Sequence, residues 1–323
     1  MKQENWSDNL IRLIEEKFAK RTQLVQALKD LLEIEREAVY RRLRNEVPFT
    51  AGEVVKISLS WNISIDKITG LRSEQIPFQM RPVDYLNPTD QDLGFLRHII
   101  ENLNALDKFP DTEFMDVCNK LPRQLLAGFS NLNRFYLFKW KYQYGCYSSE
   151  GTPIQFSEVI ISEAQRKLTA EYYQAIKNVP QSNFIFDYML FDYLANDIKY
   201  FFDIQMINAK EKKLIKKDLY DLLNYLSLVA NAGCYPETQN KVNLYISRLN
   251  LDTNYSYVCT HQAKIAFVHV FDKYEIFTFD PKTVGDFKTW MQLKKSTSFP
   301  ITEVDKKSRI EYFAKQRQLF DNI

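Results

Sequence analysis

Three basic or aromatic side chains and one glutamate recur at helical spacing near residue 40. They stand at positions i, i+3, i+4 and i+7, so a helix would carry them on one face: Glu37, Tyr40, Arg41 and Arg44, with Arg36 and Arg42 beside them. Arginine offers a planar fork for guanine, tyrosine can contact a thymine methyl group or a phosphate, and glutamate can accept from the cytosine amino group. The pattern therefore favours contact with base edges in the major groove of DNA.

The same residues also fit a solvated helix face. Glu33, Glu35 and Glu46 lie close by in the sequence and offset much of the arginine charge. The alternative to DNA binding is therefore a protein-interaction module that keeps the helices and has lost the DNA contacts. The order and spacing of the surrounding helices favour DNA binding.

Other candidate chemistry is weaker. Cys259, His261 and His269 lie near one another in the sequence, but no fourth ligand accompanies them, so we expect no metal site. The chain has only 8 Gly and lacks a nucleophile elbow, a Walker loop and a GxGxxG motif. Acidic pairs such as Asp192 with Asp197 fit salt bridges on helix faces. We therefore expect neither an enzyme nor a bound cofactor.

Composition favours a helical protein of two domains. The chain has 323 residues with 23 Phe and 19 Tyr, and its formal charge of +2 requires any DNA contact to come from a local patch. The first residues are polar, the four cysteines are scattered, and aspartates interrupt the apolar run from Phe184 to Ile207. These features predict a cytoplasmic protein that does not enter a membrane.

Apolar residues at helical spacing predict five short helices within residues 7–70. In the third, Val39 and Leu43 continue the inward face, which leaves the arginine ridge outside. The expected elements are a helix from Ser7 or Asp8 to about Lys20, a second capped by Thr22, a third over about 35–45, a fourth opened by a Thr50–Glu53 capping box, and a fifth from Ser64 that stops at Gly70.

This order of helices resembles a known family. The run LLEIEREAVYRRLRNE at 31–46, followed by SIDKI at 64–68, is similar to the lambda-repressor and Cro type (XRE-like) of helix-turn-helix domain in bacterial transcription regulators. The resemblance covers about a fifth of the chain and implies that the third helix reads DNA. By position it directs Arg36, Glu37, Tyr40 and Arg41 toward bases and Arg44 toward a phosphate.

Two positions depart from the family pattern. Glu33 stands where the family usually has the turn glycine, and Glu35 stands where it commonly has a capping Ser or Thr. A carboxylate can cap a helix, and a turn residue other than glycine costs on the order of 1 kcal/mol. Asn45 is expected to supply a left-handed residue at the end of the third helix.

The remainder of the chain is expected to form a larger domain. A proline-containing linker at 71–91 separates it from the first, and residues 92–323 are expected to be helical to about 235 and α+β from about 240. The expected segments are helices at about 92–108, 121–144, 156–178, 184–207, 210–232, 282–294 and 305–321, and strands at 242–251, 255–260, 263–271 and 275–279 with a turn at Asp272-Lys273.

The sequence thus predicts a mainly α protein with a smaller α+β part: a five-helix helix-turn-helix domain at 1–70, then a helical domain ending in a short antiparallel sheet and two helices. The layout of the second part loosely resembles the sensor regions of bacterial helix-turn-helix regulators. The expected function is transcription regulation on double-stranded DNA. Because one module reads few bases, residues 92–323 are expected to form a homodimer or to sense an effector or protein partner.

Overall fold

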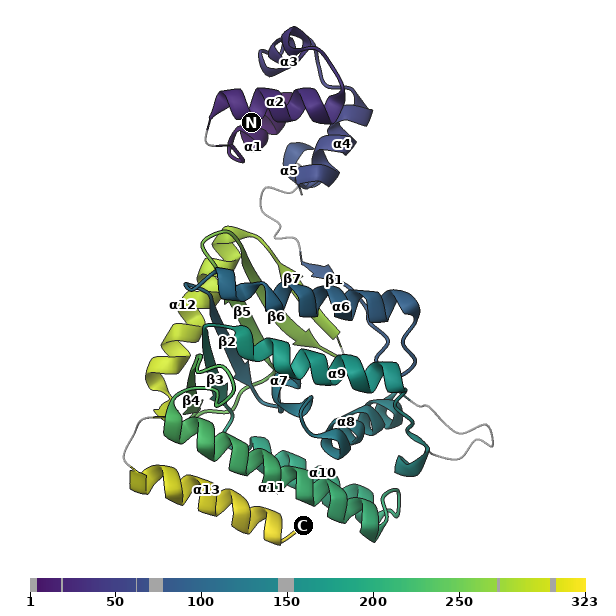
Figure 1. The fold of residues 1–323 in the computed structure, drawn as a ribbon, viewed down its shortest axis with the longest axis vertical. Helices are drawn as coiled ribbons and strands as arrows, with labels where there is room; N and C mark the ends of the chain where they lie inside the picture. The colour runs from purple at the N-terminus through teal and green to yellow at the C-terminus, as the bar shows by residue number, and fades with distance from the viewer. Residues whose placement is uncertain are drawn as a thin grey trace. The chain divides into compact units, whose positions relative to one another are not determined.

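The computed structural model describes residues 5–18, 20–61, 63–69, 78–144, 154–271, 274–302 and 306–323. The chain divides into two compact units, Met1–Ile76 and Pro77–Ile323, each with its own hydrophobic core. Within the described residues, thirteen α-helices and one eight-stranded sheet make the protein mainly α with an α+β part (Figure 1). At this level the expected fold class is confirmed.

The first unit contains five of these helices. They are α1 (Trp6–Glu15), α2 (Arg21–Leu32), α3 (Arg36–Leu43), α4 (Ala51–Trp61) and α5 (Ile65–Thr69). Leucine, isoleucine and valine side chains from all five helices enclose one core, in which Leu10, Leu28 and Ile57 are fully buried. At about 25 cal/mol per Å² of buried apolar surface, this core stabilises helices that are too short to persist alone.

Local capping agrees with the sequence at one helix and differs at two. The Thr50–Glu53 capping box is present, with the Thr50 amide 2.7 Å from a Glu53 carboxylate oxygen and the Glu53 amide 3.3 Å from the Thr50 hydroxyl. The cap of α1 is Asn5, rather than Ser7 or Asp8, and α1 ends at Glu15. Thr22 lies inside α2, which begins one residue earlier without a side-chain cap. Gly70 lies outside the described residues.

The second unit is built around the sheet. Its α-helices are α6 (Asp90–Asn104), α7 (Arg123–Leu126), α8 (Ser130–Gln143), α9 (Glu163–Ala175), α10 (Leu190–Asp203), α11 (Ala209–Ala232), α12 (Pro281–Thr297) and α13 (Lys306–Asp321). Its strands are β1 (Gln79–Met80), β2 (Glu113–Cys118), β3 (Gln181–Phe186), β4 (Lys241–Ile246), β5 (Tyr255–Cys259), β6 (Lys264–Val270), β7 (Tyr274–Thr278) and β8 (Phe299–Pro300).

The strand order is β1-β7-β6-β5-β2-β3-β4-β8. Strands β2, β3 and β4 run parallel, and all other neighbouring pairs are antiparallel. The expectation of a short antiparallel sheet restricted to the end of the chain is therefore wrong. Strand β3 lies in a stretch expected as helix from residue 184, and β2 was not expected at all.

Several other boundaries also differ. The expected helix at 121–144 is divided into α7 and α8, α9 begins only at Glu163, and the strand expected to reach 251 ends at Ile246. Within the expected linker, β1 pairs with β7, so this part belongs to the second unit. The expected turn at Asp272-Lys273 lies outside the described residues.

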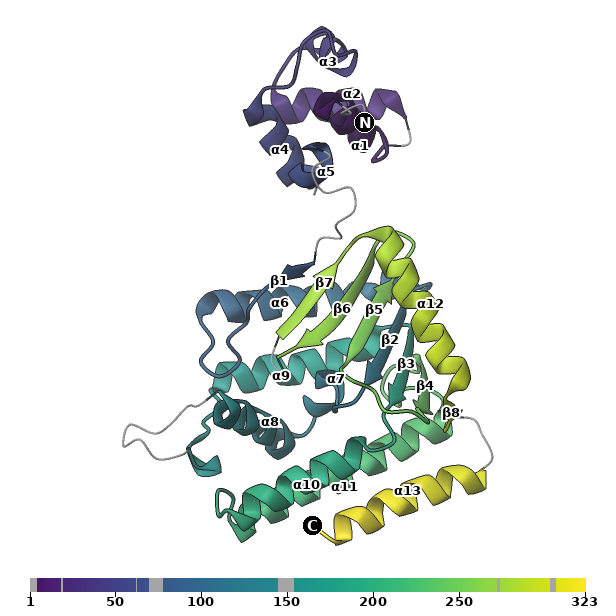
Figure 2. The ribbon, with the colours of Figure 1, turned by 180° about the vertical axis from the view of Figure 1, so that it is seen from behind.

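Helices cover both faces of the sheet unequally. Figures 1 and 2 show α6, α9 and α11 on one side and α12 on the other. Side chains alternate along β2 accordingly: Phe114 and Cys118 join the large core under the helices, whereas Met115 and Val117 pack with Val284 and Met291 of α12.

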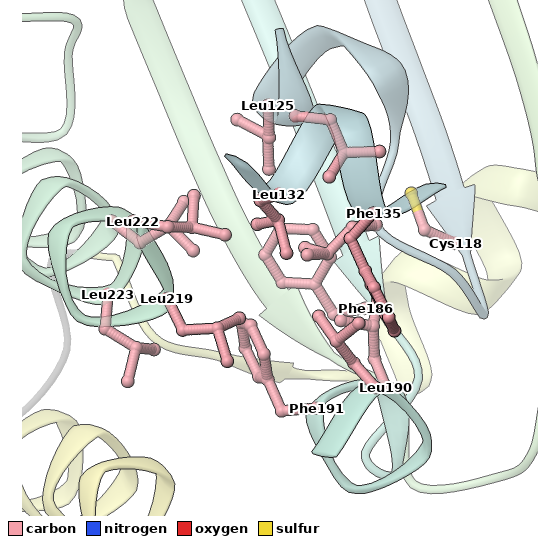
Figure 3. Packing of buried hydrophobic residues seen from close by; sticks show 14 of the residues in the cluster. Cys118, Leu125, Leu132, Phe135, Phe186, Leu190, Phe191, Leu219, Leu222 and Leu223 are labelled. Carbon is pink, nitrogen blue, oxygen red and sulfur yellow. The ribbon is translucent and has the colours of Figure 1, made fainter. Parts of the chain in front are cut away.

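The large core joins the sheet to α8, α10 and α11. Figure 3 shows Phe135 of α8 and Phe186 of β3 packed together with leucines of α11. The dense aromatic runs of the sequence belong mostly to this core, as in the edge-to-face contact of Phe138 with Phe201, whose ring centroids lie 4.8 Å apart.

Candidate nucleic-acid interface on helix α3

Helix α3 is held by its inner face and by its two ends. Val39 and Leu43 are buried in the core of the first unit. The preceding turn contains Glu33 in the left-handed conformation, at φ 56° and ψ 40°, and the helix is followed by Asn45 at φ 56°. The side chain of Asn45 also bonds Ser7 and Asp8, which ties the end of α3 to α1. The expectation of a left-handed Asn45 is confirmed.

The outer face of α3 carries the residues that the sequence singled out. Arg36, Glu37, Arg41 and Arg44 are exposed and Tyr40 is half-buried, so all five side chains reach solvent. Glu35 precedes the helix but makes no capping hydrogen bond with its side chain. Arg36 and Tyr40 interact, with the guanidinium carbon 5.8 Å from the ring centroid and a guanidinium nitrogen 3.4 Å from the hydroxyl. The pair therefore offers a planar cation and an aromatic edge side by side.

The charges on this face are partly neutralised within the unit. Arg44 contacts Glu37 at 3.1 Å and Glu46 at 2.9 Å, and the Arg41 guanidinium lies 3.8 Å from Glu46. Each of these side chains is about half exposed or more. Exposed pairs contribute about 0–1 kcal/mol, so a phosphate or base can replace the carboxylate at little cost.

Arg42 has a different role from its neighbours. Its guanidinium lies 2.8 Å from a Glu53 oxygen, with side-chain exposures of 15% and 14%, and also bonds the Ala38 carbonyl. Burial raises the pKa of Glu53, but Arg42 and the Thr50 bonds outweigh it and hold that pKa below 4.5. Arg42 thus joins α3 to α4 and is not part of the exposed ridge. The sequence did not separate it from Arg41 and Arg44.

The other candidate groups are dispersed. Cys259 is buried on the α12 side of the sheet, His261 lies 3.1 Å from Asp111, and His269 stands opposite Glu275 on β7. Within the described parts of the chain, no three His, Cys, Asp or Glu side chains gather as metal ligands. The acidic pairs contact partners elsewhere, as Asp197 does with Lys139.

One cluster escaped the sequence analysis altogether. Arg123 of α7 contacts the rings of Tyr85 and Tyr172, close to the buried Asp116 of β2. No local motif marks these residues, because they come from separate parts of the sequence. They come together only when the chain is folded.

Comparisons of the chain with protein-family models, curated proteins and solved structures found no match. Among the described helices, none combines the length and the apolar character that crossing a membrane requires. The geometry of α3 and the chemistry of the side chains that it exposes are therefore the features of this chain that bear on its function.

Proposed function

We propose that the chain is a sequence-specific DNA-binding transcription regulator. In this proposal α2 and α3 form a helix-turn-helix, α3 reads base edges in the major groove, and the second unit senses a signal or forms a dimer. Arg36, Glu37, Tyr40 and Arg41 face bases, and Arg44 contacts a phosphate.

The observation that carries this proposal is the contrast between the two faces of α3. Val39 and Leu43 are 1% and 6% exposed, whereas the arginines on the opposite face are open to solvent. A short helix fixed by its inner face can enter a major groove about 12 Å wide without rearranging its own unit. Glu33 in the left-handed region supports a tight turn before the helix, where the family that the sequence resembles usually has glycine.

The ion pairs of α3 indicate how binding proceeds. Approach of DNA replaces Glu46 and Glu37 as partners of Arg44, and the released carboxylates turn to solvent. Because an exposed pair contributes about 0–1 kcal/mol, this exchange removes little of the binding energy. The near-neutral surface also limits non-specific binding, which depends on the number of phosphates neutralised.

The test measures the affinity of the full chain for fluorescently labelled double-stranded genomic fragments. Fluorescence anisotropy is recorded at about 50 mM and about 200 mM salt. Affinity is expected to fall with salt. Arg44→Ala is expected to reduce the salt slope by about 1, and Arg41→Ala to reduce discrimination between fragments by about 1–3 kcal/mol.

Arg12→Ala is the matched control, because Arg12 is also exposed and paired, with Glu16 at 3.1 Å, but lies on α1. It should leave binding unchanged. Salt-insensitive binding, or equal losses in Arg12→Ala and Arg41→Ala, would contradict the proposal. Circular dichroism verifies that each variant remains folded, which is expected because alanine favours helix.

A second candidate is a protein-interaction module that uses the same helices. It is favoured by the carboxylates that offset the α3 charges, and by the exposed Val55 and Leu59 of α4, of which Leu59 is 80% exposed. Under this alternative Arg41→Ala and Arg44→Ala leave any DNA signal unchanged, so the same measurement decides between the two.

A further inference from the structure

A row of polar and aromatic side chains crosses the sheet of the second unit from the central strand β2 to β7, which lies next to the edge strand β1. Asp116 of β2 pairs with Ser256 of β5, Ser256 pairs with Phe267 of β6, and Phe267 pairs with Phe277 of β7. Directly paired residues on neighbouring strands point to the same face. All four side chains therefore lie on the face that carries Phe114, which is the helix-covered side of the sheet.

A second row lies two residues further along the same strands. His269 of β6 pairs with Glu275 of β7, and both point to the same face as Phe267 and Phe277. Glu275 is exposed and His269 is half-exposed. The two rows place two carboxyl groups, an imidazole, a hydroxyl and two phenyl rings on one surface.

Arg123 stands over this surface between two tyrosines. Its guanidinium carbon lies 3.8 Å from the ring centroid of Tyr85 and 5.5 Å from that of Tyr172 on α9. Burial raises the pKa of Tyr172, Arg123 lowers it, and the charges of Glu275 and Asp116 raise it further. Tyr85 packs against the large core, and Figures 1 and 2 show α7 and α9 on the side of the sheet opposite α12, so Arg123 and Tyr172 lie over the same face as the two rows.

Solvent reaches this part of the face but not the neighbouring part. Phe114 and Phe184, over β2 and β3, are 3% and 0% exposed. Ser256, Phe267 and Phe277, on the same face over β5, β6 and β7, remain half-exposed. The helices therefore cover the centre of the sheet and leave the side chains over β5, β6 and β7 partly accessible to solvent.

Arg123 hydrogen-bonds the Tyr85 side chain but, unlike other enclosed arginines of this unit, has no carbonyl or amide oxygen as a partner among the described residues. Arg134 donates to three backbone carbonyls and Arg309 to the Asn231 amide. Among the residues that the structure describes, Arg123 makes no ion pair, and it is half-buried. A charge withdrawn from water without a counter-charge is unfavourable, and an anion that pairs with it would recover that energy.

The surroundings restrict which anion fits. A single guanidinium matches one negative charge and can bond a carboxylate with two parallel hydrogen bonds. A dianionic phosphate would meet the carboxyl groups of Glu275 and Asp116, which repel a second negative charge more strongly than a first. The rings of Phe267, Phe277 and the tyrosines provide flat apolar surface. Burial raises the pKa of Asp116 to about 7, so much of it is uncharged near neutral pH and does not repel a carboxylate.

We propose that the second unit binds a small aromatic carboxylate, whose carboxylate group pairs with Arg123 and whose ring lies against Phe267 and Phe277. This ligand would be the effector of the regulator proposed above. Ligand binding can be tested independently of that function, because it is measured without DNA. Failure here leaves the DNA-binding proposal untouched, and the reverse also holds.

Benzoate is the probe, titrated calorimetrically into the full chain at pH 7. We expect a dissociation constant of about 1 mM or tighter, which is an ordinary affinity for so small a ligand. Arg123→Gln is expected to weaken binding at least tenfold. Lys212→Gln is the matched control, because the Lys212 ammonium also lies over a ring, 3.9 Å from the Phe202 centroid, and is half-buried, but belongs to α11.

Phe277→Ala provides a second variant should Arg123→Gln unfold, and it is expected to weaken benzoate binding at least threefold. Cyclohexanecarboxylate is expected to bind more weakly than benzoate, and inorganic phosphate is not expected to displace it. The proposal is overturned by an absence of benzoate binding, by equal binding to Arg123→Gln and Lys212→Gln, or by displacement of benzoate by phosphate.

Discussion

Arginines occupy opposite environments in the two units. Arg41 and Arg44 stand on the outer face of α3, about half exposed, and both contact Glu46. Arg123 is half-buried between two tyrosine rings and has no ion pair among the described residues. An exposed pair in water is weak and exchanges easily, whereas a charge enclosed by rings interacts strongly with whatever reaches it. The first arrangement suits contact with a large polyanion, the second suits selection of one small anion.

The titratable groups follow the same division. In the first unit the pKa of Glu53 is lowered, since Arg42 stabilises its charge at the base of α4. In the second unit burial is the largest cause of the raised pKa values of Asp116, Tyr172 and Tyr235. The carboxylate near α3 is thus stabilised by a charged partner, whereas burial at the sheet favours the uncharged form of these acidic groups. Each of the following changes tests one side of this contrast.

The largest effect is expected from Asp116→Asn. The folded-state pKa of about 7 lies above the unfolded value of 3.8, so the folded state holds a proton that unfolding releases between these values. Stability of the wild-type second unit therefore falls as pH rises toward 7, by about 1.4 kcal/mol per pH unit. The variant lacks this loss, so its advantage should grow by about 3 kcal/mol from pH 5 to pH 8, measured by urea unfolding.

Cys118, through a hydrogen bond, and Glu275, through its charge, also act on the Asp116 carboxyl group, and both are unchanged in the variant. Asp92→Asn is the control. Hydrogen bonds from Thr89 lower the pKa of Asp92, so this group stays charged from pH 5 to pH 8 in both states. Its replacement should therefore have the same effect at both pH values. An Asp116→Asn advantage that does not change with pH would show that enclosure does not control this carboxyl group.

Arg42→Met tests the balanced side of the contrast. It leaves Glu53 enclosed without its partner and should destabilise the first unit by about 2 kcal/mol, which hydrogen exchange of the α3 and α4 amides would report. Glu53→Gln should lose stability above about pH 4.5 and little below the lowered pKa, where the wild-type carboxylate is also neutral. Arg12→Met, at an exposed pair, should change the free energy of opening measured by hydrogen exchange by only a few tenths of a kcal/mol.

The sequence predicted elements better in the first unit than in the second, for a physical reason. Helices of the first unit are defined by residues close in sequence, so apolar spacing and the Thr50–Glu53 box locate them directly. Strands β2 and β3 are central and parallel, buried on both faces, and therefore lack the alternation that identifies a half-buried strand. Phe184 and Phe186 of β3 merge with the apolar run of α10, so one helix was expected where a strand and a helix occur.

The two candidate sites also differ in how far the sequence predicts them. Ridge residues of α3 follow from a one-dimensional spacing, and the structure leaves all five open to solvent. Separation of Arg42 from that ridge requires Glu53, which only the packing of α4 against α3 brings near. Arg123, Tyr85 and Tyr172 belong to a loop and two helices, so no spacing within a single segment indicates their contact.

Glu33→Gly tests whether the turn before α3 is strained. A glutamate at φ 56° is less favourable than glycine, which has no Cβ to clash, so the variant should stabilise the first unit by about 1 kcal/mol. Glu35→Gly is the control, because Glu35 at φ −69° is unstrained and glycine there should lower stability by about 0.5–1 kcal/mol. Thermal unfolding measures both. Equal effects of the two changes would show that the left-handed residue carries no strain.

Glu46→Gln gives the smallest expected effect and directly changes the ion pairs of the exposed arginines. It removes the carboxylate shared by Arg41 and Arg44 while leaving the helix intact. If these arginines exchange one weak partner for DNA, affinity for a bound fragment should rise about two- to fivefold, less than 1 kcal/mol, and the gain should shrink with salt. Glu16→Gln frees Arg12 in the same way on α1 and should leave affinity unchanged. A gain confined to Glu46→Gln assigns the effect to the α3 surface, whereas equal gains in both variants would assign it to net charge alone.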